Sequence, residues 1–232
     1  MRKLAFCFFM ILGCHFLLSQ NSNIAKADSL LQKLQTTSDN KIKTDIYNSL
    51  FAIYRNVDTE KANYYANQHW EMAKKINDKD KIAQSLRNKG IIQTNLGNYD
   101  TAIELYKQAL TENPFPATKA MIYGSLGRAH FLKGDIAICL EYSFKSLSIF
   151  ENLKDKKSIA NQLNNIASTY IVLGDNNNAR IYMTKAKEAL EEKTEQNAAL
   201  PIDNKTPIHQ INQTLNTETP GDFDTNKAEI YL

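Results

Sequence analysis

Small and apolar residues recur along the middle of this chain in steps of four and three, the spacing that places side chains on one face of an α-helix. Three such sets are Leu86, Gly90 and Gln93, then Tyr123, Gly127 and His130, then Leu163, Ala167 and Tyr170. A glycine follows each set, and glycine accepts the positive φ of a helix C-terminal cap. Asn or Asp comes next and favours the N-cap of a second helix. The pattern therefore predicts pairs of antiparallel helices, called hairpins below.

The same skeleton is present three times at nearly regular intervals. Ala83, Gly90, Gly97 and Ala102 recur 37 residues later as Ala120, Gly127, Gly134 and Cys139, and 40 residues further on as Ala160, Ala167, Gly174 and Ala179. A repeat of this length is typical of a solenoid, in which each unit buries its apolar face by stacking on the next. The sequence thus predicts an array that offers a long surface to a partner.

These units resemble the tetratricopeptide repeat (TPR). One unit matches the pattern of that family in full, and the next two exchange one small residue for another. The full match is Gly90, Gly97, Ala102, Ala109 and Pro114, and the departures are Cys139, Ser146 and Ala167. An earlier unit has the same outline, although His69 stands where the family prefers alanine. The resemblance implies an all-α fold, an α-solenoid of about four TPR hairpins after an N-terminal capping helix over Asn23–Gln35.

We expect the chain to be organised around this array. The expected parts are a signal peptide over 1–19, a capping helix and linker over 20–40, hairpins over 41–78, 79–115, 116–155 and 156–193, and a flexible polar tail over 194–232. The spacing exceeds the 34 residues that are standard for a TPR. We expect the excess in the joints between hairpins, with lengthened second helices.

Two of the joints, Ile76–Ala83 and Leu153–Ala160, are near copies of each other. These charged joints are similar to those in the extracytoplasmic TPR regions of bacterial sensor histidine kinases and related transcriptional regulators. Such proteins usually continue into a transmembrane helix and an output domain, and neither is evident in this sequence.

The first residues indicate export from the cytoplasm. Arg2 and Lys3 precede a mostly apolar stretch over Leu4–Leu18, which is shorter than the roughly 20 residues that span a bilayer. We therefore expect cleavage after Ser19 and a periplasmic or secreted product. The alternative is a lipoprotein anchored at Cys14, because Ile11–Cys14 looks like a bacterial lipobox.

The sequence offers little support for catalysis. It contains no P-loop, no dinucleotide-binding glycine motif and no His-Glu-x-x-His or Cys-x-x-Cys pair, so we predict no enzyme, no cofactor and no metal site. The formal net charge is +3, and Arg2 and Lys3 contribute two of these charges. The rest of the chain is therefore close to neutral, and its charge gives no reason to expect nucleic-acid binding. Cys139 and His130 occupy packed positions, and we interpret both as structural. Tyrosines at hairpin spacing, among them Tyr64, Tyr65 and Tyr106, are interpreted as interhelical packing.

The candidate site is a surface. In TPR proteins the first helices of successive hairpins line a concave groove, and the resemblance assigns groove positions residue by residue. The assigned residues are Gln84, Arg87, Ile91, Thr94, Asn95, Met121, Arg128, Phe131, Asn161, Asn164, Ser168 and Ile171. Side-chain amides, two arginines and an apolar floor suit an extended peptide, whose backbone needs hydrogen bonds and whose side chains need pockets.

These observations lead to two hypotheses. The first is a non-catalytic TPR scaffold that binds a protein or peptide through the groove. The alternative is the input module of a signal-transduction protein, a histidine kinase or transcriptional regulator without its membrane and output domains. The oligomeric state and the identity of the partner do not follow from the sequence.

Overall fold

The structure is a computed structural model that describes residues 24–191, and every described regular element is an α-helix. Residues 24–36 form the first helix. The others, in chain order, are α2 (Asn40–Tyr54), α3 (Thr59–Lys75), α4 (Lys79–Asn95), α5 (Tyr99–Thr111), α6 (Pro116–Lys133), α7 (Ile136–Leu153), α8 (Lys156–Val172) and α9 (Asn176–Leu190). The expected signal peptide and tail lie outside the described residues.

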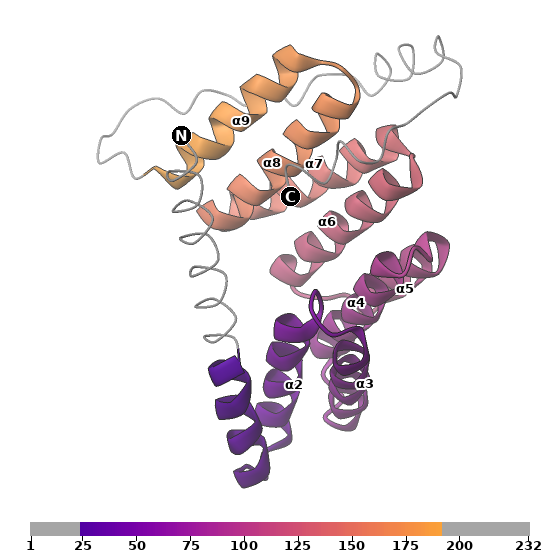
Figure 1. Cartoon of the computed structure of the whole chain (residues 1–232), viewed down its shortest axis with the longest axis vertical. Helices are drawn as coiled ribbons and strands as arrows, with labels where there is room; N and C mark the ends of the chain where they lie inside the picture. The colour runs from indigo at the N-terminus through magenta and orange to yellow at the C-terminus, as the bar shows by residue number, and fades with distance from the viewer. Residues whose placement is uncertain (1–23, 192–232) are drawn as a thin grey trace, which may run out of the picture.

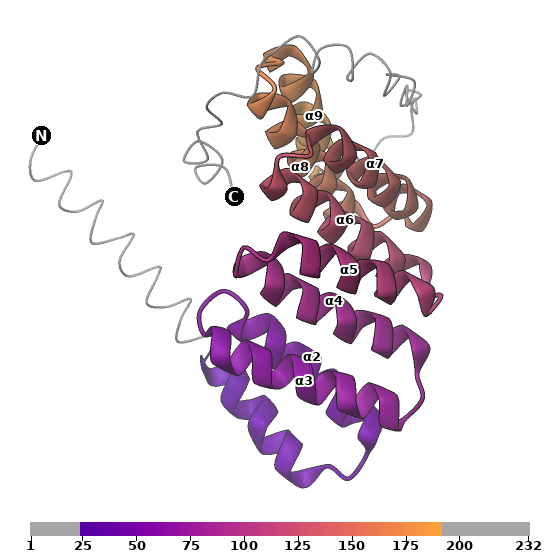
Figure 2. The ribbon, with the colours of Figure 1, turned by 90° about the vertical axis from the view of Figure 1, so that its right-hand side faces the viewer.

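The eight labelled helices form four hairpins, α2–α3, α4–α5, α6–α7 and α8–α9, which stack in chain order (Figures 1 and 2). Each second helix also contacts the first helix of the next hairpin. Residues Leu30, Leu31 and Leu34 of the first helix pack on the core of the N-terminal hairpin. The prediction of an all-α solenoid of four TPR hairpins with a capping helix is therefore confirmed.

The helix ends show how the sequence sets this architecture. Gly97, Gly134 and Gly174 have φ angles of 79°, 93° and 74°, so each supplies the left-handed residue that turns the chain within a hairpin. Asp side chains at the N-caps of α2, α3, α4, α8 and α9 accept hydrogen bonds from free backbone N–H groups, as Asp78 does from Lys81 N at 3.1 Å. At three joints between hairpins, non-glycine residues take the left-handed conformation: Asn77, Asn113 and Lys154.

The expected lengthening of the second helices is correct for some hairpins and wrong for one. Helices α3 and α7 contain 17 and 18 residues, whereas α5 contains only 13 and ends at Thr111. Asn113 is left-handed and Pro116 occupies the first turn of α6, so the extra residues of this unit lie in a loop rather than in the helix.

Small residues let the two helices of a hairpin approach each other. Ala102 and Ala109 are fully buried, and Cys139, at 3% exposed, occupies the equivalent place in the next hairpin. Burial, the largest cause, raises the pKa of the Cys139 thiol, which fits a packed residue rather than a reactive one. A Cβ atom added to Gly90 would lie 2.4 Å from the ring of Tyr106, so only glycine fits beside that tyrosine.

Large rings fill the space that the small residues leave. Tyr170 stacks on Tyr182 with 5.4 Å between ring centroids, and His130 stacks on Tyr142 at 5.7 Å. The structure therefore places His130 in the packing between helices. Tyr64 differs from the expectation, because its side chain is 56% exposed, although its ring makes an edge-to-face contact with that of Tyr65.

None of the helices over residues 24–191 combines the length and the apolar character that crossing a membrane requires.

Candidate interaction surface

The first helices of the three N-terminal hairpins lie side by side. Helix α4 packs against both α2 and α6, and Figure 1 shows these three helices on one side of the array with α3 and α5 on the other. We call the exposed and half-exposed side chains of α4, α6 and α8 on this side the first-helix face. All the predicted groove residues belong to these three helices.

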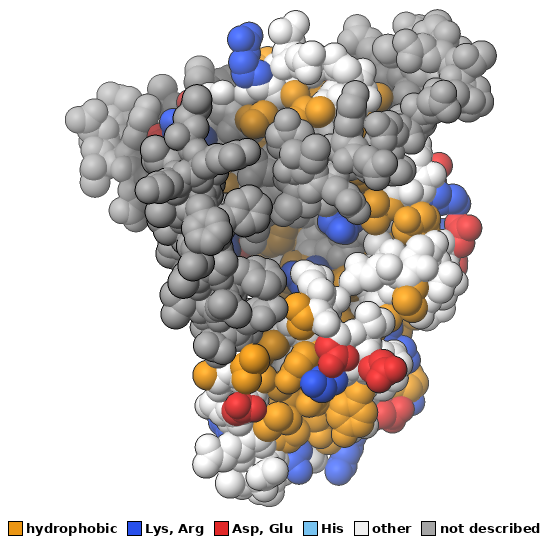
Figure 3. Space-filling view, viewed as in Figure 1, with side chains coloured by type: hydrophobic (Ala, Val, Ile, Leu, Met, Phe, Trp, Pro, Cys, Tyr) orange, Lys and Arg blue, Asp and Glu red, His pale blue; other side chains and the backbone are white. Residues whose placement is uncertain are grey.

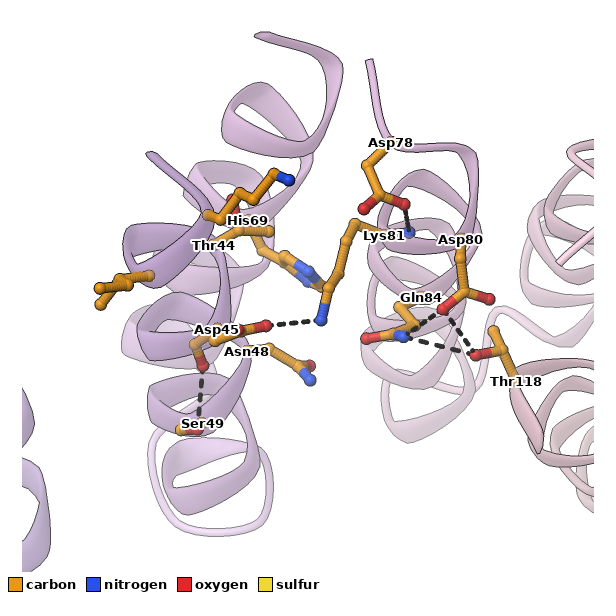
Figure 4. Close-up of polar contacts among 12 residues, drawn as sticks. Thr44, Asp45, Asn48, Ser49, His69, Asp78, Asp80, Lys81, Gln84 and Thr118 are labelled. Atoms are coloured by element: carbon orange, nitrogen blue, oxygen red, sulfur yellow. Dashed lines mark hydrogen bonds and ion pairs between the residues drawn. The ribbon is translucent and has the colours of Figure 1, made fainter. Parts of the chain in front are cut away.

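On α4, most of the predicted residues are used to join hairpins. The side-chain amide of Gln84 donates to Asp80 Oδ2 at 2.8 Å and to Thr118 Oγ1 of α6 at 3.4 Å (Figure 4). Asp80 also accepts from Thr118 Oγ1 at 3.2 Å and from the backbone N–H of Phe115 at 2.9 Å. This network fixes the start of α6 against α4, so Gln84 is already engaged within the protein.

Arg87 is also a joining residue. Its Nε donates to the backbone oxygen of Met121 at 3.1 Å and to Ser125 Oγ at 2.9 Å, both on α6. Burial, the largest cause, and the positive charge of Arg55 lower the pKa of Arg87 to about 10, so it stays charged at neutral pH. Replacement of Arg87 would therefore disturb the contact between two hairpins as well as any ligand contact.

Two other predicted residues on α4 lie away from an open groove. Thr94 is only 4% exposed and shares a 3.0 Å hydrogen bond with the Tyr106 hydroxyl, so it belongs to the core of its hairpin. Asn95 is exposed, but its amide donates to the backbone oxygen of Arg55 at 3.1 Å and ties the end of α4 to the end of α2. Ile91 is half-buried and packs on the neighbouring apolar cores.

The predicted residues on α6 and α8 are more open. Arg128, Asn161 and Asn164 are exposed, and their side chains form no hydrogen bond with any residue in the range 24–191. Ser168 is half-buried and donates only to the backbone oxygen of Asn164 at 3.0 Å. Met121, Phe131 and Ile171 are half-buried on the same two helices and supply apolar surface. The structure thus divides the predicted site into a joining half on α4 and an open half on α6 and α8.

Two features of the structure were not identified from the sequence as possible sites. One is a cleft of about 410 Å³ lined by residues of α3, α4 and α5. Its lining consists of Trp70, Lys74, Ile82, Leu86, Gln108, Thr111 and Glu112. Lys74 and Lys89 lie 4.1 and 4.5 Å from the centroid of the Trp70 ring, so both cations are held by cation–π contacts.

The other feature is a buried polar cluster around His69. The Asn88 amide donates to Asn48 Oδ1 at 2.8 Å and meets His69 Nδ1 at 3.2 Å. Lys81 pairs with Asp45 at 2.5 Å, and Figure 4 shows this pair together with His69 and Asn48. His69 is completely buried, and its Nε2 has no partner among the described residues. Burial, the largest cause, and the charge of Lys81 lower the pKa of His69 to about 4. The cluster therefore joins α2, α3 and α4 with His69 held neutral.

Apolar side chains are also exposed near the N-terminal end of the array. Figure 3 shows them gathered over α2 and α3, where Val57 is 71% and Tyr64 is 56% exposed. In the part of the chain that the structure describes, no three His, Cys, Asp or Glu side chains come together as ligands for a metal ion.

The repeated hairpins and their small-residue contacts define this protein as a TPR solenoid. A family model described as the SusR N-terminal TPR domain matches residues 19–202, and the chain belongs to this family. A search of curated proteins found no match.

Two solved structures have the same fold. BtubC (BKLC) from P. vanneervenii is 21% identical, with a TM-score of 0.55 over 80% of this chain and 81% of BtubC. A Rap protein complexed with Competence and Sporulation Factor is 16% identical, with a TM-score of 0.66 over 75% of this chain. The match covers half of the Rap chain, and at these identities both likenesses concern the fold alone.

Proposed function

We propose that this protein is a non-catalytic scaffold, exported from the cytoplasm, that binds a protein or an extended peptide through the open half of its first-helix face. The observation that carries the proposal is the contrast between the side-chain amides on the two halves of that face. Gln84 is engaged by Asp80 and Thr118, whereas Asn161 and Asn164 are exposed without side-chain partners among residues 24–191.

Open amides suit a peptide backbone for a simple reason. Each backbone unit of an extended peptide offers one donor and one acceptor, and an Asn side chain can satisfy both. Half-buried Phe131 on α6 and Ile171 on α8 provide apolar contacts for peptide side chains. TPR membership supports this use of the surface, and the Rap complex shows that a protein of this fold binds another factor.

The proposal can be tested by affinity capture from extracts of the source organism with the purified full chain as bait. Asn164→Trp would place a bulky ring on the open half of the face. Ser148→Trp is the matched control, because Ser148 is exposed on the second helix α7. We expect the wild type and the Ser148 variant to retain the same protein, and the Asn164 variant to lose at least tenfold of it.

Equal recovery by all three baits would contradict the proposal, as would recovery of nothing specific by the wild type. Arg87 is unsuitable for this test because its side chain joins α4 to α6. Thermal unfolding of each variant should confirm that the array remains folded.

A second candidate function is the input module of a larger signal-transduction protein. The observation that favours it is the description of the matching family as an N-terminal domain. The coding sequence downstream of this chain distinguishes the two. An in-frame transmembrane helix followed by a kinase or DNA-binding domain would support the input module, and the absence of both would support the separate scaffold.

A further inference from the structure

Two lysines meet at one tryptophan in the cleft lined by α3, α4 and α5, which we call the Trp70 cleft. The Nζ atoms of Lys74 and Lys89 lie 4.1 and 4.5 Å from the centroid of the Trp70 ring. Neither lysine forms an ion pair with a carboxylate among residues 24–191. Because an ammonium group carries three N–H donors and a full positive charge, the Trp70 cleft is suited to a ligand with carboxylates.

The floor of the Trp70 cleft is apolar. Ile82 and Leu86 of α4 line it together with Trp70, and all three side chains are half-buried. The volume of about 410 Å³ falls in the range of sites that take small ligands, roughly 300–1,000 Å³. Glu112 carries the only carboxylate among the lining residues and is outnumbered by the two lysines. The cleft therefore combines an apolar floor with an excess of positive charge.

One short segment of this sequence has the complementary chemistry. Phe223 is the only aromatic residue of the chain with an acidic residue on each side, namely Asp222 and Asp224. Residues 192–232 also carry a net negative charge, with seven Asp or Glu residues and three Lys residues. A phenyl ring on the apolar floor leaves the neighbouring carboxylates at the mouth of the cleft, where the long lysine side chains can reach them.

This segment is long enough to reach the cleft along the array. The 30 residues 192–221 separate it from Glu191, and in extended form they span roughly 100 Å. The helices from α5 to α9 contact one another in chain order, and packed helices lie about 8–10 Å apart. Helix α5 therefore lies within about 40 Å of α9, well inside the reach of the intervening chain.

We propose that residues 222–224 bind in the Trp70 cleft. The Phe223 ring lies on the apolar floor, and the carboxylates on either side of it pair with Lys74 and Lys89. This contact ties the C-terminal segment to the N-terminal half of the array. It uses α3, α4 and α5 rather than the open half of the first-helix face, so it does not depend on the function proposed for that face.

Trp70 itself can report whether the cleft is occupied. It is the only tryptophan of the chain, so the tryptophan fluorescence of the full-length protein comes from the cleft alone. Two control substitutions remove an apolar side chain and a carboxylate elsewhere in the same segment. Quenching by acrylamide is measured on the wild type and on four variants: Phe223→Ala, Asp222→Asn with Asp224→Asn, and the controls Ile208→Ala and Asp203→Asn.

We expect the quenching constant to rise about twofold in Phe223→Ala and in the double Asp variant, because loss of the bound segment opens the indole to the quencher. The two controls should match the wild type. Equal constants in all five proteins would overturn the proposal. The constants should also be independent of protein concentration. Shielding that grows with concentration would show that a second copy supplies the segment, which contradicts docking within one chain.

A peptide titration tests the role of the lysines. A synthetic peptide of residues 218–228 is added to full-length Phe223→Ala while the Trp70 emission is followed. The same titration is made with Lys74→Glu added to this variant, and with Lys41→Glu, an exposed lysine on α2, as the matched control. We expect Lys74→Glu to weaken binding at least tenfold, Lys41→Glu to leave it unchanged, and high salt to weaken it in the parent.

The peptide also tests the carboxylates directly. A second peptide has Asn in place of Asp222 and Asp224 and should bind at least tenfold more weakly than the first. Equal affinity of the two peptides, or unchanged affinity in Lys74→Glu, would overturn the pairing with the lysines. Absence of any binding by the first peptide would overturn the Trp70 cleft as the site of this segment.

Discussion

At the residue scale, His69 shows how a single large polar side chain is accommodated where the repeat favours a small one. Ala109, Ser146 and Ala186 occupy the equivalent positions in the other three hairpins, and all are buried. His69 fits because Asn88 and Asn48 supply a polar lining from α4 and α2. At this position the N-terminal hairpin therefore has a polar network that joins three helices in place of a close helix contact.

His69 should make the stability of the array depend on pH. Its pKa in the folded protein is about 4, against 6.5 for an ordinary histidine, so the unfolded chain binds more protons between these values. The stability from neutral His69 is complete above pH 6.5 and is lost as pH falls towards 4. The nearby charged groups are Lys81, which lowers this pKa, and Asp45, which raises it.

We expect the difference in unfolding free energy between the wild type and His69→Gln to fall by about 2 kcal/mol from pH 7 to pH 4.5. Urea denaturation at a series of pH values measures it, and the carboxylates common to both proteins cancel in the difference. A difference that stays constant over this range would show that His69 is not held neutral.

Residue identity alone could predict some of these positions and not others. The small residues at Ala102, Cys139 and Ala179 mark close helix contacts, and the structure buries all three. The role of Arg87 could not be predicted, because the TPR pattern gives the direction of a side chain but not the partners that a neighbouring hairpin brings within reach. Thr94 was misplaced for a similar reason: the Tyr106 hydroxyl draws it into the core.

At the scale of elements, three of the hairpins have different residue pairs at the equivalent contact between their two helices. Gly90 of α4 faces Tyr106 of α5, and Gly127 of α6 faces Ser143 of α7. The corresponding pair in α2 and α3 is Leu50 and Ala66, both completely buried. The large side chain comes from the second helix in α4–α5 and from the first helix in α2–α3, whereas both residues of the α6–α7 pair are small.

We predict that Gly90→Ala destabilises the protein by about 1–3 kcal/mol, because its Cβ would overlap a ring that is buried and anchored by Thr94. The double variant Gly90→Leu with Tyr106→Ala recreates the pair of the N-terminal hairpin. It should recover part of the stability lost in Gly90→Leu alone. Thermal or urea unfolding measures all of them.

A stability for Gly90→Ala equal to that of the wild type would contradict the contact. No recovery in the double variant would show that the two positions do not compensate each other.

The positions of most helices were predictable from the sequence because glycine, Asn and Asp mark the turns. The early end of α5 was not predictable, because it depends on the left-handed Asn113 and on Pro116 rather than on the apolar spacing.

At the scale of the whole molecule, the array divides into two parts that differ in their polar contacts. Polar contacts between hairpins gather on α4, where Lys81 and Asn88 bond to α2 and α3, and Gln84 and Arg87 bond to α6. The α6–α8 region leaves its amides and Arg128 exposed. We infer that the first part fixes the shape of the array and the second part contacts the partner.

The fold at this scale followed from the sequence, because a repeat with glycine-marked turns permits few other arrangements. The residues available on the first-helix face could be predicted from the sequence only in part. A repeat pattern places equivalent residues on the same face of every hairpin, so it cannot distinguish Gln84, which is engaged, from Asn161, which is open. That difference depends on Asp80 and Thr118, which have no counterpart beside Asn161.

The most direct test of the proposed surface is photo-crosslinking in living cells of the source organism. A photoreactive amino acid is introduced at Arg128 or Asn164 on the first-helix face, and at Glu104 or Ser148 on the exposed sides of α5 and α7 as matched controls. We predict one crosslinked product, with the same partner, from Arg128 and Asn164 and no such product from Glu104 and Ser148. Crosslinks that form only at Glu104 and Ser148, or at none of the four positions, would contradict binding through the first-helix face.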